Sequence, residues 1–314
     1  MKINIVGGGA IGLSLAARLS RSGIAVRLWT RTESQAQIIT EHGISLHGAD
    51  GGISVHRVEA VCSERLLGQS ELAGSAPGDW VMLTVKQTHL ADGQTIRLIG
   101  QLADSGGGAA LGVLCLQNGI GHMERLRDAL PNVAFVQGIT NEGGLRIDER
   151  TVAYTGHGEL HMGPGADAEG QKMFVKALRK AGITAFVSKD ILTHVYRKLV
   201  VNAVVNPLTA LYGVRNGELP NDPIRLALMR AVYAETLAVL VAAGMKESGS
   251  EWERVLDVCR HTANNLSSMR RDVEEGRITE VAAINGGVAA LAERLGKSAP
   301  LNTALAVMIG ALDR

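Results

Sequence analysis

Residues 2–12 read KINIVGGGAIG, an apolar strand that runs directly into a glycine-rich turn and the start of a helical pattern. In this GxGxxG turn, Gly7 permits the tight bend, Gly9 lets the backbone approach a pyrophosphate, and Gly12 lets the helix pack closely against the strand. The phosphates then bind at the helix N-terminus. The stretch therefore predicts a Rossmann-type domain that holds a dinucleotide through Gly7, Gly9, Ala10, Ile11 and Gly12.

A second strand is expected at 25–30, and the residue that follows it indicates which dinucleotide binds. A cofactor with a free ribose 2′-hydroxyl is usually met by Asp or Glu at this point, whereas this chain has Arg31. A guanidinium suits a 2′-phosphate, so NADP(H) is preferred over NAD(H). Two alternatives stay open, because Glu33 lies two residues further on and because Arg31 is also acceptable as an ordinary surface arginine.

Two further apolar strands are expected at 80–85 and 111–116, and polar residues follow each of them. Lys86 follows the first strand and Asn118 the second. In an open α/β sheet, ligands bind beyond the carboxyl ends of the strands, so both side chains are candidates for binding the cofactor. Asn118 can also offer its amide to a substrate, although an Asn before a Gly is equally typical of a simple turn.

The alternation of strand and helix patterns ends near residue 189. The other strands expected before that point are 44–47 and 53–58, which form a hairpin, and 133–140, 151–156, 159–162 and 184–187. From residue 191 onward the patterns are helical, and the expected helices are 191–211, 223–243, 251–259, 268–274, 279–295 and 301–312. We therefore expect an α/β chain with an NADP-binding Rossmann-type domain at 1–189 and an all-helical substrate and catalytic domain at 190–314.

The segment 196–207, YRKLVVNAVVNP, places polar residues in an otherwise apolar helix. Lys198, Asn202 and Asn206 are spaced four residues apart and drift by only about 80° over two turns, so they share one face. Burying an ammonium and two amides costs several kcal/mol unless each finds a partner, and a bound ligand is one such partner. The alternative is a lysine that reaches solvent while both asparagines bond neighbouring backbone. Pro207 is expected to distort the helix just after this stripe.

Charge and cysteine content argue against several classes of protein. The 32 Lys and Arg residues nearly cancel the 31 Asp and Glu residues, so no strong field draws the chain to nucleic acid or to an anionic membrane. The three cysteines, Cys62, Cys115 and Cys259, lack the spacing of a metal site or a disulfide framework, which favours a reducing cytoplasm. The chain has no apolar run long enough to span a membrane. A small-molecule partner is expected.

Several motifs together resemble the ketopantoate reductase family, the 2-dehydropantoate 2-reductases. They are GGGAIG at 7–12, VKQ at 85–87, LQNGIG at 116–121, KLVVNAVVNPLTAL at 198–211, NNLSSMRRD at 264–272 and ITEVAAING at 278–286. The resemblance covers nearly the whole chain and implies NADPH as the cofactor. It implies Lys198 as the general acid and Glu280 as a residue that helps place the reacting groups. The substrate-binding residues that it implies are Asn118, Asn202, Asn206, Asn265 and Ser268.

The implied reaction is the reduction of a 2-oxo acid, with 2-dehydropantoate, reduced to (R)-pantoate for pantothenate and coenzyme A synthesis, as the leading substrate. Hydride passes from the nicotinamide to the carbonyl carbon, while Lys198 donates a hydrogen bond and then a proton to the carbonyl oxygen. Closure of two domains around the reactants would align them and exclude water. No metal is needed. A cytoplasmic enzyme is expected, with a homodimer as the candidate assembly.

One position departs from the family pattern and keeps other functions open. After the strand at 133–140 the family usually has a Thr-Thr-His-Gly type of run, where this chain has Glu142 in place of His. If that loop lines the substrate pocket, a carboxylate there would repel an acid substrate or recognise an amine or a hydroxyl. The substrate is therefore open, and the alternative is a D-2-hydroxy acid dehydrogenase of the same scaffold that acts on a bulkier or aromatic 2-oxo acid. A hypothesis of another class is a non-catalytic NADP-binding regulator. The intact set of Lys198, Asn202 and Glu280 argues against the regulator.

Overall fold

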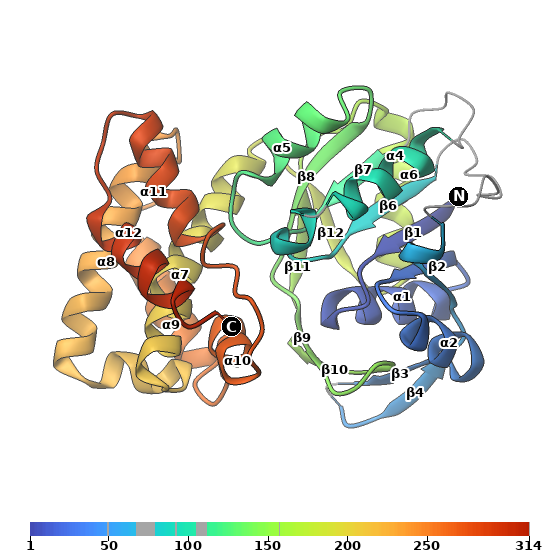
Figure 1. Ribbon diagram of the computed structural model, residues 1–314, viewed down its shortest axis with the longest axis horizontal. Helices are drawn as coiled ribbons and strands as arrows, with labels where there is room; N and C mark the ends of the chain where they lie inside the picture. The colour runs from blue at the N-terminus through green and yellow to red at the C-terminus, as the bar shows by residue number, and fades with distance from the viewer. Residues whose placement is uncertain (49, 67–78, 92, 105–111, 157, 314) are drawn as a thin grey trace. The chain divides into compact units, whose positions relative to one another are not determined.

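The computed structural model describes residues 1–48, 50–66, 79–91, 93–104, 112–156 and 158–313. The chain divides into two compact units (Figure 1). The first, here called the sheet unit, comprises Met1–Gln117 and His122–Ile191. The second, the helical unit, comprises Leu192–Arg314 together with the short segment Asn118–Gly121. This segment therefore packs with residues that follow it by more than seventy positions in the sequence.

The sheet unit contains an eight-stranded sheet with the order β12-β11-β8-β7-β6-β1-β2-β5 (Figure 1). Its strands are β1 (Lys2–Val6), β2 (Ala25–Thr30), β5 (Glu59–Cys62), β6 (Trp80–Leu83), β7 (Gly112–Cys115), β8 (Ala134–Thr140), β11 (Glu159–Met162) and β12 (Thr184–Val187). Neighbouring strands pair in parallel, apart from the antiparallel pair of β8 and β11. The strand order reverses at β1, which lies between β2 and β6. In such sheets this reversal is where ligands bind, beyond the carboxyl ends of the strands.

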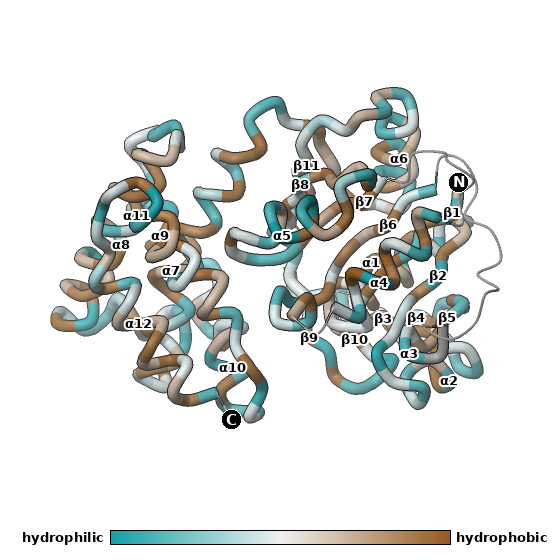
Figure 2. The backbone as a smooth tube through the Cα atoms, turned by 45° about the horizontal axis from the view of Figure 1, so that its top comes forward, coloured by the Kyte–Doolittle hydropathy of each residue, from teal (hydrophilic) through white to brown (hydrophobic). Residues whose placement is uncertain are grey.

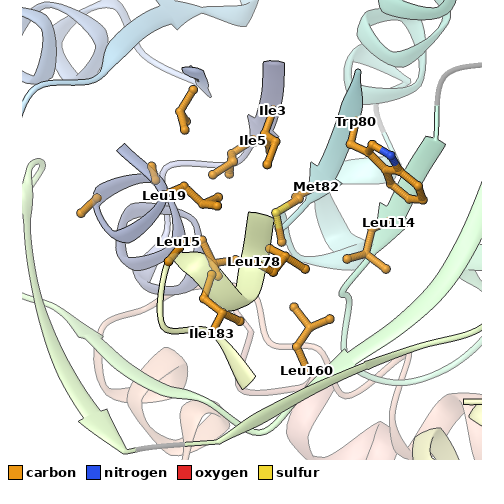
Figure 3. Close-up of a cluster of buried hydrophobic side chains, with 14 of the residues drawn as sticks. Ile3, Ile5, Leu15, Leu19, Trp80, Met82, Leu114, Leu160, Leu178 and Ile183 are labelled. Atoms are coloured by element: carbon orange, nitrogen blue, oxygen red, sulfur yellow. The ribbon is translucent and has the colours of Figure 1, made fainter. Parts of the chain in front are cut away.

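Helices cover both faces of this sheet. Successive side chains of a strand point to opposite sides, so a strand such as β1 contributes to two cores. Ile3 and Ile5 of β1 pack in one core with α1 (Ala10–Arg21) and α6 (Ala168–Lys180), and Figure 3 shows this cluster. Val6 belongs to a second core with α4 (Gln94–Asp104) and α5 (His122–Ala129). Each fully buried Leu or Ile contributes about 1.5–3 kcal/mol relative to exposure, so these two cores hold β1 and the turn after it in place. The remaining helical elements of the unit are α2 (Glu33–His42), α3 (Ser63–Leu66) and η1 (Gln87–Leu90).

A second sheet, with the order β4-β3-β10-β9, lies against α1. Its strands are β3 (Ile44–His47), β4 (Ile53–His56), β9 (Gly143–Arg146) and β10 (Thr151–Gly156). The antiparallel pairing of β3 with β4 confirms the predicted hairpin, although β4 ends two residues early. Because α1 contacts strands of both sheets, polar groups on its outer side are buried as well. This placement decides the surroundings of Arg18, described below.

The predicted strands are found, with small differences at their ends. β6 ends at Leu83 and β7 at Cys115, so the polar residues that follow them belong to loops. Residue 111, the predicted start of the latter strand, lies outside the described residues. The sequence patterns do not predict β5 or β9, which are four residues long each, and β9 begins with two glycines that weaken strand propensity.

The helical unit consists of α7 (Ile191–Tyr212), which begins in the sheet unit with Ile191, η2 (Asn216–Asn221), α8 (Pro223–Ala242), α9 (Glu251–His261), α10 (Ser268–Glu274), α11 (Asn285–Arg294) and α12 (Pro300–Gly310). As predicted, its described residues form no strand. α12 is coloured largely hydrophobic in Figure 2, as expected for a helix that packs on α8 and α11. Among the helices described, none is long and apolar enough to cross a membrane.

Two predictions about these helices need correction or refinement. The pattern at 279–295 is not one helix, because α11 begins only at Asn285 and the residues before it form turns. α7 continues through Pro207 as one helix to Tyr212. Proline removes one backbone N–H from a helix, so a carbonyl one turn earlier must find another donor.

Candidate functional site

The glycine turn after β1 has the geometry that close approach by a ligand requires. Gly7 has a φ of 121°, which glycine adopts without strain, and its N–H donates to Trp29 O at 2.9 Å. A Cβ on Gly12 would lie 1.9 Å from Gly7 O, so this position must be glycine for α1 to pack on the turn. A Cβ on Gly9 would meet nothing within 4 Å. The backbone at Gly9 is therefore open, as it must be to receive a pyrophosphate.

The other candidate cofactor residues lie at neighbouring strand ends. Arg31 follows β2 and is exposed, and Lys86 follows β6 and is half-buried. Both strands pair directly with β1, so the carboxyl ends of the three strands are adjacent in the sheet. The glycine turn follows the first of these ends, and Arg31 and Lys86 follow the other two. Ala10 and Ile11 open helix α1. The sheet unit thus gathers every predicted cofactor-binding residue except Asn118, which belongs to the helical unit.

In the helical unit the structure joins Asn118 to Glu280, residues that are 162 positions apart. The Nδ2 of Asn118 donates a hydrogen bond to Glu280 Oε2 at 2.9 Å. Glu280 is only 7% exposed, so its carboxylate interacts with neighbours in a surrounding of low polarity. The turn interpretation of Asn118 is therefore incomplete, because its amide bonds a buried carboxylate.

Lys198 lies within the electrostatic reach of that carboxylate. Burial lowers the pKa of Lys198 to about 8, and the negative charge of Glu280 opposes this shift by favouring the ammonium form. A pKa near neutral pH suits a proton donor, since the group is charged at rest yet releases its proton readily. Asn118, Lys198 and Glu280 therefore form one polar group, here called the lysine cluster.

Two asparagines continue the polar stripe of α7 beyond Lys198. Asn202 is half-buried and Asn206 is 8% exposed, while the remaining faces of the helix fill the core with side chains such as Leu199 and Val204. The structure therefore agrees with the predicted stripe in its placement.

The segment Asn118–Gly121 is held on the loop that carries Glu280. Ile120 N–H donates to Ala283 O at 3.1 Å. A Cβ on Gly119 would lie 2.3 Å from the same oxygen, and a Cβ on Gly287 would lie 2.9 Å from Ile120 Cγ1. Gly119 is explained by close approach to the backbone of Ala283, and Gly287 leaves room for the Ile120 side chain. These contacts hold the segment that carries Asn118 against the loop that carries Glu280.

Asn265 and Ser268 belong to the helical unit, and both are exposed. Ser267, not Ser268, caps α10 by accepting from Arg270 N–H at 3.1 Å, and Thr209 of α7 donates to Ser267 Oγ at 2.7 Å. In the part of the chain that the structure describes, hydrogen bonds link neither the Asn265 side chain nor that of Ser268 to the lysine cluster.

Sequence reasoning missed Asn216, which supports the same segment. Its N–H donates to Asn265 O at 3.1 Å and its Nδ2 to Thr262 Oγ1 at 2.9 Å. The side chain is buried, and among the described residues its Oδ1 has no hydrogen-bond partner. Asn216 precedes a glycine, which is typical of a turn, so its residue type alone gives no sign of this role.

Glu142, the departure from the family pattern, is engaged inside the sheet unit. Its Oε1 accepts from Arg18 Nη1 at 2.6 Å and from the Tyr154 hydroxyl at 3.3 Å. Arg18 also donates to Gly182 O at 2.6 Å, and its guanidinium lies 4.9 Å from the centre of the Tyr154 ring. The side chains of Arg18 and Glu142 are 8% and 3% exposed. The charge of this carboxylate is thus compensated by the protein itself.

The described residues contain no group of three His, Cys, Asp or Glu side chains placed to hold a metal ion. The three cysteines are buried and unpaired, and burial raises the pKa of Cys115 to about 12 and that of Cys259 to about 11. Thiols with such pKa values are poor nucleophiles.

Comparison with known proteins gives matches over nearly the whole chain. The family described as Ketopantoate reductase PanE/ApbA matches residues 3–167, and the model of its C-terminal part matches 190–313. The 2-dehydropantoate 2-reductase of Bacillus subtilis (strain 168) is 34% identical over 288 residues, which cover 91% of this chain and 89% of the relative.

Solved structures agree with these matches. The crystal structure of a probable 2-dehydropantoate 2-reductase from Bacillus subtilis has a TM-score of 0.80 and 31% identity, and the match covers 99% of this chain and 100% of the other. D-mandelate dehydrogenase, in a ternary structure with NADH and anilino(oxo)acetate, has a TM-score of 0.84 and covers 100% of this chain and 98% of its own. At 23% identity the latter shows a shared fold.

Proposed function

The chain belongs to the ketopantoate reductase family, and we propose that it reduces 2-dehydropantoate to (R)-pantoate with NADPH, using Lys198 as the general acid. The observation that carries this proposal is the lysine cluster. A buried lysine with a pKa of about 8, beside a carboxylate that an asparagine holds in place, suits proton donation to a carbonyl oxygen.

Each residue of the cluster has a distinct part in the proposed reaction. As negative charge develops on the carbonyl oxygen, the Lys198 ammonium stabilises it by a charge-assisted hydrogen bond and then transfers a proton. Glu280 keeps Lys198 protonated, because its negative charge raises the pKa of the ammonium against the effect of burial. Asn118 orients Glu280 and completes the group.

We propose two domains, an NADP-binding domain at 1–189 and a substrate and catalytic domain at 190–314. The remaining candidate residues are assigned either to the substrate or to the cofactor. We propose that the substrate is held by Asn202, Asn206, Asn265 and Ser268. The open backbone at Gly9 and the packing of Gly12 fit a pyrophosphate at the start of α1. We assign NADPH binding to Gly7, Gly9, Ala10, Ile11, Gly12, Arg31, Lys86 and Asn118. Bound there, NADPH supplies the hydride. We further propose that the enzyme works in the cytoplasm as a homodimer.

A second candidate is a D-2-hydroxy acid dehydrogenase that acts on an aromatic 2-oxo acid. The shared fold with D-mandelate dehydrogenase favours keeping it. The Arg18–Glu142 ion pair argues against this candidate. Because Arg18 compensates the charge of Glu142 inside the sheet unit, this carboxylate gives no reason to exclude 2-dehydropantoate as the substrate. A non-catalytic regulator is third, since it would have no use for a lysine with a lowered pKa.

A substrate panel separates these functions. The consumption of NADPH is measured with 2-dehydropantoate, with straight-chain and branched 2-oxo acids, and with phenylglyoxylate, and each assay is repeated with NADH. The highest kcat/KM is expected for 2-dehydropantoate with NADPH. A preference for phenylglyoxylate would favour the second candidate, and bound but unreacted NADPH throughout the panel would favour the regulator.

The rate of reduction is expected to fall as the pH rises through about 8, the pKa of Lys198, because only the ammonium form donates a proton. Replacing Glu280 by Gln removes the negative charge that favours this form, so the Glu280→Gln variant should lose activity at lower pH than the wild type. The measurement is the pH dependence of kcat/KM for 2-dehydropantoate. Glu293→Gln, an exposed carboxylate of the same unit, is the control that should leave the profile in place. An unchanged profile in Glu280→Gln would contradict the role given to its charge.

Arg31→Ala is expected to weaken NADPH binding about tenfold and to leave NADH binding nearly unchanged. A hydrogen bond to a charged group contributes about 1.5–3 kcal/mol, and NADH lacks the 2′-phosphate that would accept it. Binding of each cofactor is measured by fluorescence titration, with the exposed Arg127→Ala as control. Equal losses for both cofactors would contradict the assignment of Arg31 to the 2′-phosphate.

A further inference from the structure

Pro207 leaves one carbonyl of helix α7 without its helical donor. In an α-helix the N–H of residue i bonds the carbonyl of residue i−4, and proline has no N–H. The carbonyl affected is that of Ala203, which lies one residue after Asn202 and is itself buried. A buried carbonyl left without a donor costs about 1–3 kcal/mol, so a donor from elsewhere is expected.

Asn285 supplies that donor. Its Nδ2 donates to Ala203 O at 3.0 Å and to Asn302 Oδ1 at 3.0 Å. Asn302 is held in turn, because its Nδ2 donates to Glu235 Oε1 at 2.9 Å and to Thr236 Oγ1 at 3.0 Å. Asn285, Asn302 and Thr236 are 0% exposed. Since Glu235 and Ala203 present acceptors at the two ends, the chain of bonds fixes the orientation of both amides.

Asn285 is also the first residue of α11 and directly follows the turns that begin at Glu280. Ala283 N–H and Ile284 N–H both donate to Glu280 O at 3.0 Å, and Gly286 N–H donates to Val281 O at 3.0 Å. On the other side of Glu280, Thr279 N–H donates to Asp313 Oδ1 at 3.0 Å. The backbone between Glu280 and Asn285 is therefore tightly bonded, so a displacement of Asn285 moves Glu280 as well.

We propose that Asn285 is a positioning residue of the proposed reductase site, which uses the carbonyl freed by Pro207 to fix the Glu280 loop on the segment of α7 that carries Lys198. The proline and the asparagine act as a matched pair: one exposes an acceptor in the helix and the other binds it from the loop. The role rests on the proposed function, because it is exerted through Glu280 and Lys198. The bond between Asn285 and Ala203 keeps the Glu280 carboxylate where its negative charge favours the ammonium form of Lys198. The neighbouring charged residue of the helix, Arg197, faces a different carboxylate, Glu251 of α9.

The decisive experiment compares Asn285→Ala, Pro207→Ala and the double variant by a readout that does not require catalysis. Lys198 is acylated with acetic anhydride at a series of pH values, and its modification is followed by mass spectrometry, which gives the midpoint of its titration. Thermal unfolding of each variant is measured in parallel. In Asn285→Ala the midpoint should fall below that of the wild type, since Glu280 no longer holds its place beside the ammonium.

The double variant separates positioning from stability. Replacing Pro207 by alanine restores an N–H for the Ala203 carbonyl, so Pro207→Ala/Asn285→Ala should recover most of the melting temperature lost in Asn285→Ala. The Glu280 loop still lacks its anchor, so the lowered midpoint should remain. Because its buried carbonyl has a donor, the double variant also gives a folded sample if Asn285→Ala does not fold. Pro207→Ala alone should keep the wild-type midpoint, because a carbonyl oxygen can accept two hydrogen bonds.

Thr236→Val is the matched control from the same network. It removes the hydroxyl that bonds Asn302 and leaves the bond between Asn285 and Ala203 intact, so it should lower the melting temperature without moving the midpoint. With 2-dehydropantoate, Asn285→Ala and the double variant should show kcat lowered about 10- to 100-fold, as expected for a small misplacement of a catalytic group. A wild-type midpoint in the double variant would overturn the proposal, whether or not the protein reduces 2-dehydropantoate. A wild type without reductase activity would instead overturn the proposed function.

Discussion

Lys198→Ala is expected to lower kcat for the reduction of 2-dehydropantoate by about 10³-fold or more while leaving the Kd for NADPH nearly unchanged. General acid catalysis contributes about 10²–10⁴-fold, and the loss of a charged hydrogen-bond donor to the developing oxyanion adds to this. Lys198 belongs to the helical unit, whereas the glycine turn, Arg31 and Lys86 belong to the sheet unit. Removing its side chain should therefore affect turnover far more than cofactor binding.

The measurement is steady-state turnover together with a fluorescence titration of NADPH. Lys297→Ala, which removes an exposed lysine of the same unit, is the matched control and should keep wild-type turnover. Lys198→Ala that retains more than a tenth of wild-type kcat would show that the proton comes from another group.

Glu142→Ala is expected to lower the free energy of unfolding by about 3–5 kcal/mol, because it leaves the Arg18 guanidinium buried without its counter-ion. The neighbouring Tyr154 hydroxyl loses an acceptor at the same time. The reductase reaction should continue in the fraction that stays folded, since Glu142 is assigned no part in it. Chemical denaturation followed by circular dichroism gives the free energy, and turnover per folded molecule is measured beside it.

Glu59→Ala is the matched control for this prediction. Glu59 also pairs with an arginine, Arg27, but its side chain is 48% exposed, so the loss should be about 0–1 kcal/mol. The double replacement Arg18→Met/Glu142→Leu removes both charges and should recover much of the stability lost in Glu142→Ala. A stable Glu142→Ala variant with altered substrate preference would contradict this structural role and indicate that Glu142 lines the substrate pocket.

Much of the fold follows from local sequence patterns. The glycine turn at 7–12 specifies a strand, a tight bend and a helix within a dozen residues, and the continuous apolar runs that became β6 and β7 are typical of buried parallel strands. The patterns do not predict elements whose formation depends on tertiary contacts. β5 is short and weakly patterned, and it forms because the edge of β2 offers it partners.

The candidate site was predictable in part for a similar reason. The stripe of Lys198, Asn202 and Asn206 is a local pattern, because three polar residues at a spacing of four are conspicuous in an apolar helix. The bond between Asn118 and Glu280 joins distant parts of the chain, and no spacing rule connects them. The pairing of Arg18 with Glu142 is equally distant, so the sequence showed an unusual carboxylate but not its partner.

The role of Asn285 depends partly on a local pattern and partly on a contact between distant parts of the chain. Pro207 inside a helical pattern indicates that a carbonyl needs another donor, and this much is local. Which residue provides the donor depends on how the Glu280 loop packs on α7, and that packing becomes visible only in the structure.

The most direct test of the central claim is a single-turnover experiment at pH 7, in which protein loaded with NADPH is mixed with excess 2-dehydropantoate and the loss of NADPH absorbance is followed. We expect rapid oxidation of the bound NADPH by the wild type, with (R)-pantoate as the product, and oxidation about 10³-fold slower or more in Lys198→Ala. Wild-type protein that binds NADPH but does not oxidise it with 2-dehydropantoate, or a Lys198→Ala variant that oxidises it at the wild-type rate, would contradict the account.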